Sequence, residues 1–159
     1  MKLINCIVLF ALIILSVLIS AQENNTFEKY VPEINEWIGS ELIESVINIA
    51  DSKLVTLVKT YKKEESSITF TLSCGKKDLV TAGNNIDLSD CEKIIFNGFE
   101  AYKFQINGTG SIYLKILEKD DLKGEILIAY FRIGDATIEE LLNEFNFKGM
   151  YLELVKLFK

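Results

Sequence analysis

The sequence predicts an α+β fold in which an antiparallel sheet of about five strands is flanked by an N-terminal and a C-terminal helix. Three observations lead to this prediction. Polar and apolar residues alternate over much of residues 99–133, which is typical of successive strands. Apolar residues recur at steps of three and four after Pro32 and again after Asp135, which is the spacing that gives a helix one apolar side.

A basic residue and a long apolar run open the chain. Lys2 is followed by apolar residues over 3–19 and then by the small residues Ser20-Ala21. These are the parts of a secretory signal peptide that is cleaved after the small residues. The alternative is an uncleaved membrane anchor, because the run approaches the ~20 residues that span a bilayer. We expect residues 1–21 to be a signal peptide and residues 22–159 to form one exported domain, periplasmic or secreted, with no stable membrane span after cleavage.

The first predicted element of that domain is a helix that begins near Pro32. Proline suits the first turn, where its missing N–H costs nothing, and the apolar stripe extends for about 18 residues. The stripe consists of Ile34, Trp37, Ile38, Leu42, Val46 and Ile49. Such a helix should pack its apolar side on the sheet.

Two strands that form a hairpin are expected next. Residues 54–61 are rich in apolar and β-branched types, and residues 68–73 alternate strictly between apolar and hydroxyl side chains. Residues 62–67, of which the first four are charged, lie between them as the turn. A long connection then covers residues 75–90, and connections of this length are often functional or held by a constraint.

A meander of three strands is predicted over residues 99–106, 111–117 and 125–133. Asn107-Gly108 between the first two strands is typical of a tight hairpin, because both positions tolerate positive φ. One face of the first strand holds Glu100, Tyr102, Phe104 and Ile106. Tyr102 is interpreted as a core residue. The third strand is apolar nearly throughout, so we expect it in the middle of the sheet, covered on both faces.

The last predicted helix begins at Asp135 or Thr137, which are both acceptable N-caps. Thr137 and Glu140 have the spacing of a capping box, and Lys148-Gly149 is expected to end the helix. Residues 150–158 could form a short helix or an edge strand, and periodicity does not decide between them.

Two cysteines remain after cleavage of the leader, Cys74 and Cys91. In an exported protein such a pair predicts a disulfide, which would stabilise by about 3 kcal/mol on the chain-entropy model. Two free thiols are the alternative interpretation. A metal site is disfavoured, because the chain contains no histidine and two cysteines alone lack further ligands.

Charge and composition exclude several classes of function. The net charge is −6, and it becomes −7 when the leader removes Lys2, its one charged residue. An acidic chain disfavours nucleic acid as a partner. The absence of histidine removes Ser-His-Asp and Cys-His catalysis and the usual zinc ligands. No cofactor-binding motif is present, so we predict no cofactor.

Four residues are candidates for contact with a ligand or partner. Arg132, the single arginine, lies close to Asp135 at a helix start and could bind an anion in a bidentate way. More often such an arginine pairs with a neighbouring carboxylate. Asp87 and Asp90 lie in the long connection, where carboxylates could hold calcium or act as a catalytic pair. The simpler interpretation of these acidic residues is a solvated turn.

The segment Asn97-Gly98-Phe99-Glu100-Ala101-Tyr102, the hairpin after it, and residues 126–132 and 138–149 resemble small, uncharacterised exported bacterial proteins. Their layout is similar to the sandwich shared by the PsbP and Mog1 proteins. The leader ending Ser20-Ala21-Gln22 resembles leaders common in the Bacteroidetes group. This resemblance implies an antiparallel sheet between two helices, and it carries over no functional residues.

No segment of the chain has the pattern of a catalytic motif. We therefore expect an exported, non-catalytic binding or accessory protein with an unknown protein or small-molecule partner in the cell envelope. It would act through a face of the sheet or through residues 75–90. The alternatives are a small-molecule or lipid carrier with a pocket between sheet and helix, and a small enzyme that uses carboxylates.

Overall fold

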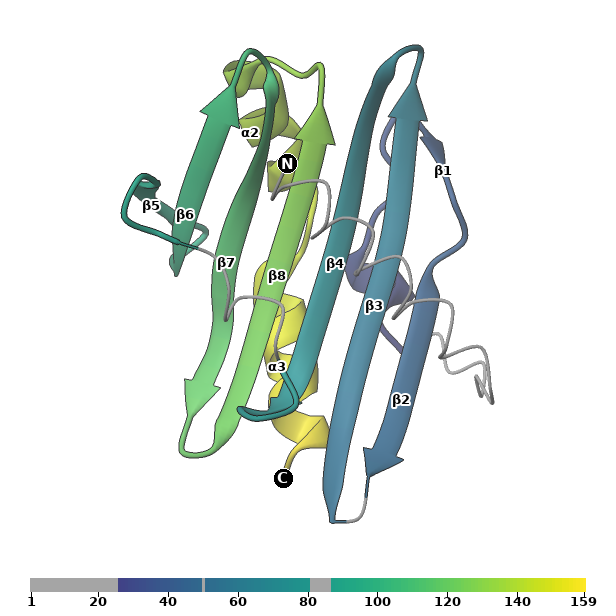
Figure 1. Ribbon diagram of the computed structural model, residues 1–159. Helices are drawn as coiled ribbons and strands as arrows, with labels where there is room; N and C mark the ends of the chain where they lie inside the picture. Colours follow the sequence, from purple (N-terminus) through teal and green to yellow (C-terminus); the bar gives the residue numbers. More distant parts are fainter. Residues whose placement is uncertain (1–25, 50, 81–86) are drawn as a thin grey trace.

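The computed structural model describes residues 26–49, 51–80 and 87–159, without the side chains of residues 135 and 136. In this part of the chain the dominant feature is one antiparallel sheet of eight strands (Figure 1). The elements are η1 (Glu28–Tyr30), β1 (Ile38–Gly39), β2 (Ile43–Ile49), β3 (Ser52–Lys63), β4 (Ser66–Lys76), β5 (Glu92–Phe96), β6 (Phe99–Ile106), β7 (Thr109–Lys119), β8 (Leu122–Phe131), α2 (Asp135–Asn143) and α3 (Phe147–Leu157). The expectation of about five strands between an N-terminal and a C-terminal helix is therefore wrong.

The strands are ordered β1-β3-β4-β8-β7-β6-β5 across the sheet, and β2 pairs with β3 beside β1. The predicted hairpin of β3 and β4 and the predicted meander of β6, β7 and β8 are confirmed. They meet where β4 pairs with β8, from Ser67 opposite Phe131 to Lys76 opposite Leu122. Strand β8 thus lies in the middle of the sheet, as its lack of alternation predicted.

The predicted helix after Pro32 is wrong, because residues 38–39 and 43–49 form β1 and β2 on the edge of the sheet. Glu36 has a φ of 66°, in the left-handed region where an α-helix cannot continue. Four of the seven residues of β2 are Ile or Val, which lose side-chain freedom in a helix and pack well on a sheet. Pairing with β3 along all seven residues outweighs the helical spacing.

The turn between β6 and β7 follows the prediction from its dipeptide. Asn107 and Gly108 have φ values of 50° and 73°. Two central residues with positive φ define the turn whose twist matches that of the flanking strands. The register of β6 and β7, with Ile106 opposite Thr109, is thereby fixed locally.

Helices α2 and α3 and the short η1 all lie on one face of the sheet, which we call the inner face (Figure 1). The helix expected after Asp135 is confirmed as α2, but its N-cap is Gly134 with no side-chain cap, so the predicted capping box is wrong. The tail that periodicity left open is helix α3. Lys148-Gly149 lies inside α3, because Asn146 caps this helix by accepting from the Gly149 N–H at 2.8 Å.

The core fills the space between these helices and the inner face. Phe145, in the link between α2 and α3, has its ring centroid 5.2 Å from that of Phe70 on β4 and 5.7 Å from that of Phe147. Every second residue of the central strands faces these rings. The buried residues of this face include Leu57, Tyr61, Ile68, Phe70, Leu72, Ile112, Leu114, Ile126 and Ile128.

Candidate functional site

The opposite surface of the sheet, which we call the outer face, carries the alternate residues of each strand. None of the described helices packs against it (Figure 1). Its two halves differ in chemistry. Over β3 and β4 it is lined mainly by short hydroxyl side chains, which include Thr56, Thr60, Thr69, Thr71 and Ser73, with Leu54, Val58 and Lys62 among them. Over β5 to β8 it is lined by charged and aromatic side chains, and this half contains the candidate site.

Two tyrosines lie at the centre of this half. Tyr102 on β6 is directly opposite Tyr113 on β7, and their ring centroids are 6.3 Å apart. The Tyr102 hydroxyl donates to Glu100 Oε1 at 2.6 Å, and the Tyr113 hydroxyl donates to Glu125 Oε1. Each tyrosine is thus held by a carboxylate of the outer face.

Two lysines complete the arrangement through the register of neighbouring strands. Lys93 on β5 is opposite Tyr102, and its Nζ lies 2.6 Å from Glu100 Oε2. Lys115 on β7 places its Nζ 3.1 Å from Glu100 Oε1. Both ammonium groups also lie over the Tyr102 ring, at 5.9 and 5.3 Å from its centroid. We call this set the tyrosine patch, which consists of Lys93, Glu100, Tyr102, Tyr113, Lys115 and Glu125.

The electrostatics of the patch favour fixed protonation states. Hydrogen bonds from Lys93, Tyr102 and Lys115 lower the pKa of Glu100 to about 2. The same carboxylate raises the pKa of both Lys93 and Lys115. Burial, followed by the hydrogen bond to Glu125, raises the pKa of Tyr113. Since each of these four pKa values moves away from neutrality, none of the four groups is suited to exchange protons near pH 7.

The low pKa of Glu100 predicts a specific dependence of stability on pH. The pKa of an unfolded glutamate is about 4.3, so the stabilising contribution of Glu100 is complete above about pH 5 and is lost as the pH falls towards 2. In urea titrations at pH 6, 4, 3 and 2, wild type should be more stable than Glu100→Gln at pH 6, and this difference should shrink towards zero at pH 2. A difference that stays constant over this range would contradict the assignment.

The two cysteines predicted to form a disulfide are both free. Cys74 is buried on β4, and Cys91 immediately precedes β5, with β8, β7 and β6 between these two strands. Neighbouring strands are ~4.8 Å apart, so four spacings amount to about 19 Å, and a disulfide needs Cα atoms within about 7 Å. The disulfide prediction is therefore wrong, and the alternative of two free thiols describes the structure. Burial raises the pKa of Cys74 to about 12 and also raises that of Cys91.

Arg132 pairs with a carboxylate, but its partner is Glu65 in the turn between β3 and β4. Its guanidinium also lies 5.2 Å from the centroid of the Phe131 ring. Asp135 begins α2, and its side chain lies outside the described part of the structure. The ion pair with Glu65 is the simpler of the two interpretations of Arg132.

Asp87 and Asp90 lie in the turn before β5, whereas Arg132 follows β8, and strands β7 and β6 lie between β8 and β5. Asp87 Oδ1 accepts from the Ser89 N–H at 3.0 Å, and this bond lowers the pKa of Asp87. Both aspartates are exposed. Residues 81–86 of the predicted long connection lie outside the described residues. Within 26–49, 51–80 and 87–159, no three Cys, Asp or Glu side chains are grouped as a metal site would require.

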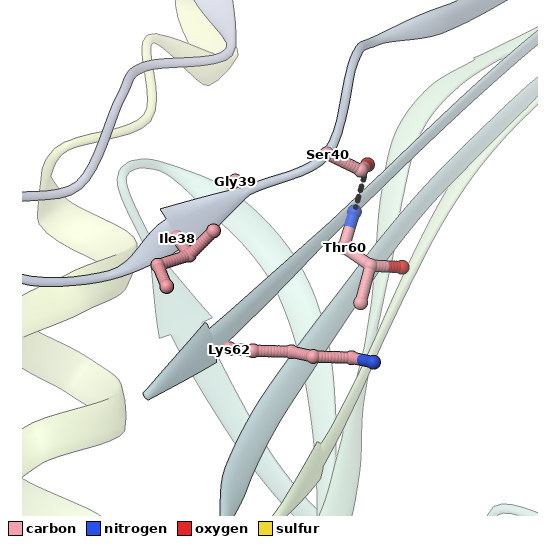
Figure 2. A pocket seen from close by; sticks show the side chains of 5 residues that line it. All are labelled: Ile38, Gly39, Ser40, Thr60 and Lys62. Carbon is pink, nitrogen blue, oxygen red and sulfur yellow. Dashed lines mark hydrogen bonds between the residues drawn. The ribbon is translucent and has the colours of Figure 1, made fainter. Parts of the chain in front are cut away.

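A hollow of ≈ 390 Å³ lies at the edge of the sheet where β1 pairs with β3 (Figure 2). Its lining residues are Ile38, Gly39, Ser40, Thr60 and Lys62. The Ser40 N–H donates to the Thr60 carbonyl at 2.8 Å, and the Thr60 N–H donates to Ser40 Oγ at 3.1 Å. These hydrogen bonds join the segment after β1 to strand β3. We therefore interpret the hollow as a result of how these two segments pack at the edge, and not as a binding site.

Sequence reasoning missed the tyrosine patch. It placed Glu100 and Tyr102 on one face of a strand but interpreted Tyr102 as core, whereas Tyr102 is half-buried on the outer face. The signal in the sequence was the set of residues that share a strand face with Tyr102. A face that holds both a charged residue, Glu100, and an aromatic one, Phe104, is more typical of a surface than of a core. Lys93 and Lys115 join it only through strand register.

Comparisons with known proteins give no information about function, so a proposed function must be based on the geometry of the site. No protein family, curated protein or solved structure matches the chain. The resemblance to exported bacterial proteins and to the PsbP and Mog1 layout therefore stays a prediction. Among the described residues, no helix has the length and apolarity that crossing a bilayer requires.

Proposed function

We propose that this chain is an exported, non-catalytic binding protein that contacts a protein partner through the outer face over β5 to β8. The observation that carries this proposal is the tyrosine patch together with its apolar surroundings. Ile95, Phe104 and Ile106 project from the same face and are 70%, 39% and 60% exposed. Tyrosine and phenylalanine are enriched where protein interfaces are tightest, and a polar network beside them gives such a surface orientation.

The charge of the patch favours a protein over a membrane or nucleic acid. Lys93 and Lys115 face two carboxylates, Glu100 and Glu125, so the patch has no basic excess. The whole chain has a net charge of −6. Phosphate backbones and anionic membranes require the opposite balance.

The same geometry gives little support to catalysis or carriage. Glu100 shares its carboxylate among three donors, so it is a poor general acid or base. A carrier would need a cavity of about 300 Å³ or more between sheet and helices. In the described residues this space holds the ring of Phe145 stacked on the rings of Phe70 and Phe147. These rings would have to separate to admit a ligand.

A photo-crosslinking amino acid at Phe104 tests the proposal in cells that produce the protein naturally. We expect a discrete covalent adduct of fixed mass, recovered with the cell envelope or the medium. The control position is Leu152 on α3, which is 49% exposed but lies on the side of the helices. Equal adducts at both positions, or none at Phe104, would overturn the proposal.

A charge reversal within the patch makes the test specific. Lys115→Glu places a third carboxylate beside Glu100 and Glu125 and should reduce the adduct from Phe104 at least severalfold. Lys119→Glu, at the exposed end of the same strand, is the matched control and should leave the adduct unchanged. An adduct that survives Lys115→Glu at full yield would count against the tyrosine patch as the contact surface.

A further inference from the structure

The edge of the sheet formed by β2 carries an interaction surface of its own. Strand β2 pairs with β3 on one side, and among the described elements no strand pairs with its other side. Figure 1 shows it at the right-hand margin of the sheet, away from β5 to β8. An unpaired edge offers backbone N–H and C=O groups to any strand that can align with it.

Strand β2 has few of the features that usually protect an edge, and its one charged residue is Glu44, which accepts from the Phe27 N–H. Its seven residues, Ile-Glu-Ser-Val-Ile-Asn-Ile, include no lysine and no proline, and its pairing with β3 has no register shift. By contrast, the opposite edge strand β5 has five residues and carries an exposed lysine, Lys93. The two edges of the sheet therefore differ in how well they are protected against pairing with a further strand.

The exposed apolar side chains of β2 are arranged symmetrically. Ile43, Val46 and Ile49 are 56%, 37% and 45% exposed, and the outer two are each three residues from Val46. In an antiparallel pairing about a two-fold axis, residues equally far from the axis lie opposite each other, so this spacing sets Ile43 against Ile49 and Val46 against Val46. We infer that β2 pairs with β2 of a second copy of this chain, so that the two sheets join into one.

The register of this pairing follows from a two-fold axis through Val46, perpendicular to the sheet. Ile43 then lies opposite Ile49 of the second copy on the outer face, and Ser45 lies opposite Ile47. On the inner face Val46 meets Val46, and Glu44 lies opposite the neutral Asn48. Directly opposed pairs of this kind stabilise a sheet when they are apolar and destabilise it when they carry like charges.

This register is the best of those that keep the faces matched. A shift by two residues in either direction would leave two residues of each β2 strand without a partner from the other β2. A shift by one residue would place inner-face side chains against outer-face side chains. Only the register centred on Val46 pairs all seven residues, and in it the two Glu44 carboxylates do not lie opposite each other.

The oligomeric state in solution tests the inference. The protein is expressed from the full 159-residue sequence and purified in the form that the cell yields. Sedimentation velocity from 1 to 100 µM should show a dimer that dissociates on dilution. Val46→Lys sets two ammonium groups opposite each other on the axis and should weaken the dimer by roughly 100-fold or more. Ile95→Lys on the opposite edge is the control and should leave the dimer intact.

A covalent variant keeps the inference testable if Val46→Lys impairs folding. In a Cys91→Ser background, Val46→Cys should form a disulfide-linked dimer under mild oxidation, because Cβ atoms directly opposite on antiparallel strands lie about 5 Å apart. Ile95→Cys in the same background should not. A monomer at 100 µM, a dimer insensitive to Val46→Lys, or equal crosslinking at both positions would overturn the inference.

Discussion

Phe145→Ala should lower the free energy of unfolding by about 3–5 kcal/mol, the usual cost of truncating a buried phenylalanine. The Phe145 side chain is 3% exposed. Its ring stacks on those of Phe70 and Phe147 and meets the Tyr61 ring edge-on at 6.1 Å between centroids. Because the residue sits in the link between α2 and α3, its loss leaves a cavity where both helices are fixed to the sheet. Urea unfolding followed by circular dichroism measures the change.

Phe131→Ala is the matched control for this prediction. Phe131 ends β8, is 44% exposed, and lies on the outer face, so its truncation should cost about 1 kcal/mol or less. A loss as large as that of Phe145→Ala would mean that the outer face is part of the core. A small effect of Phe145→Ala would mean that the helices pack loosely on the sheet.

The centre of the sheet was predictable because its signals are local. Asn107-Gly108 specifies the turn between β6 and β7 by conformation alone. The apolar run in β8 predicted a strand in the middle of the sheet, and β8 does lie between β4 and β7. The expected cover on both faces is wrong, because Ala129 and Phe131 are exposed on the outer face. These elements needed no knowledge of distant pairing.

The N-terminal edge was not predictable by the same reasoning. The steps of three between Ile43, Val46 and Ile49 indicate a helix, but in the structure they place apolar residues on both faces of an edge strand. Helical spacing and a two-sided strand give the same pattern over seven residues. Pairing with β3 decides between a helix and a strand for these residues. The sequence between β2 and β3 contains no typical turn dipeptide that would predict this pairing.

The candidate site required register, which the sequence does not supply. Lys93, Tyr102 and Lys115 come from three different strands, and only their pairing brings the two ammonium groups over one ring. The failed disulfide has the same cause. The spacing of Cys74 and Cys91 along the chain contains no information about the three strands that separate them in the sheet.

Gly110→Ala should destabilise the protein by about 3 kcal/mol or more, at the upper end of the cost of overpacking. A Cβ at Gly110 would lie 2.1 Å from the Phe104 carbonyl oxygen and 2.8 Å from the Tyr130 hydroxyl. The first neighbour is backbone of the paired strand β6, so it cannot turn aside as a side chain would. Gly134→Ala is the control, because nothing lies within 4 Å of its Cβ and its φ of −72° suits any residue, so it should cost about 1 kcal/mol or less.

The position of the clash also predicts which part of the sheet loses the most stability in Gly110→Ala. Gly110 is opposite Gln105, whose side-chain oxygen accepts from the Tyr130 hydroxyl at 2.7 Å, so relief of the clash must open the end of the β6–β7 hairpin. Amide hydrogen exchange in Gly110→Ala should therefore accelerate first at residues 104–110, while β3 and β4 keep their protection. Uniform acceleration across the sheet would show instead that this hairpin is an inseparable part of the fold, and that the outer face over β5 to β8 cannot adjust to a partner independently of the core.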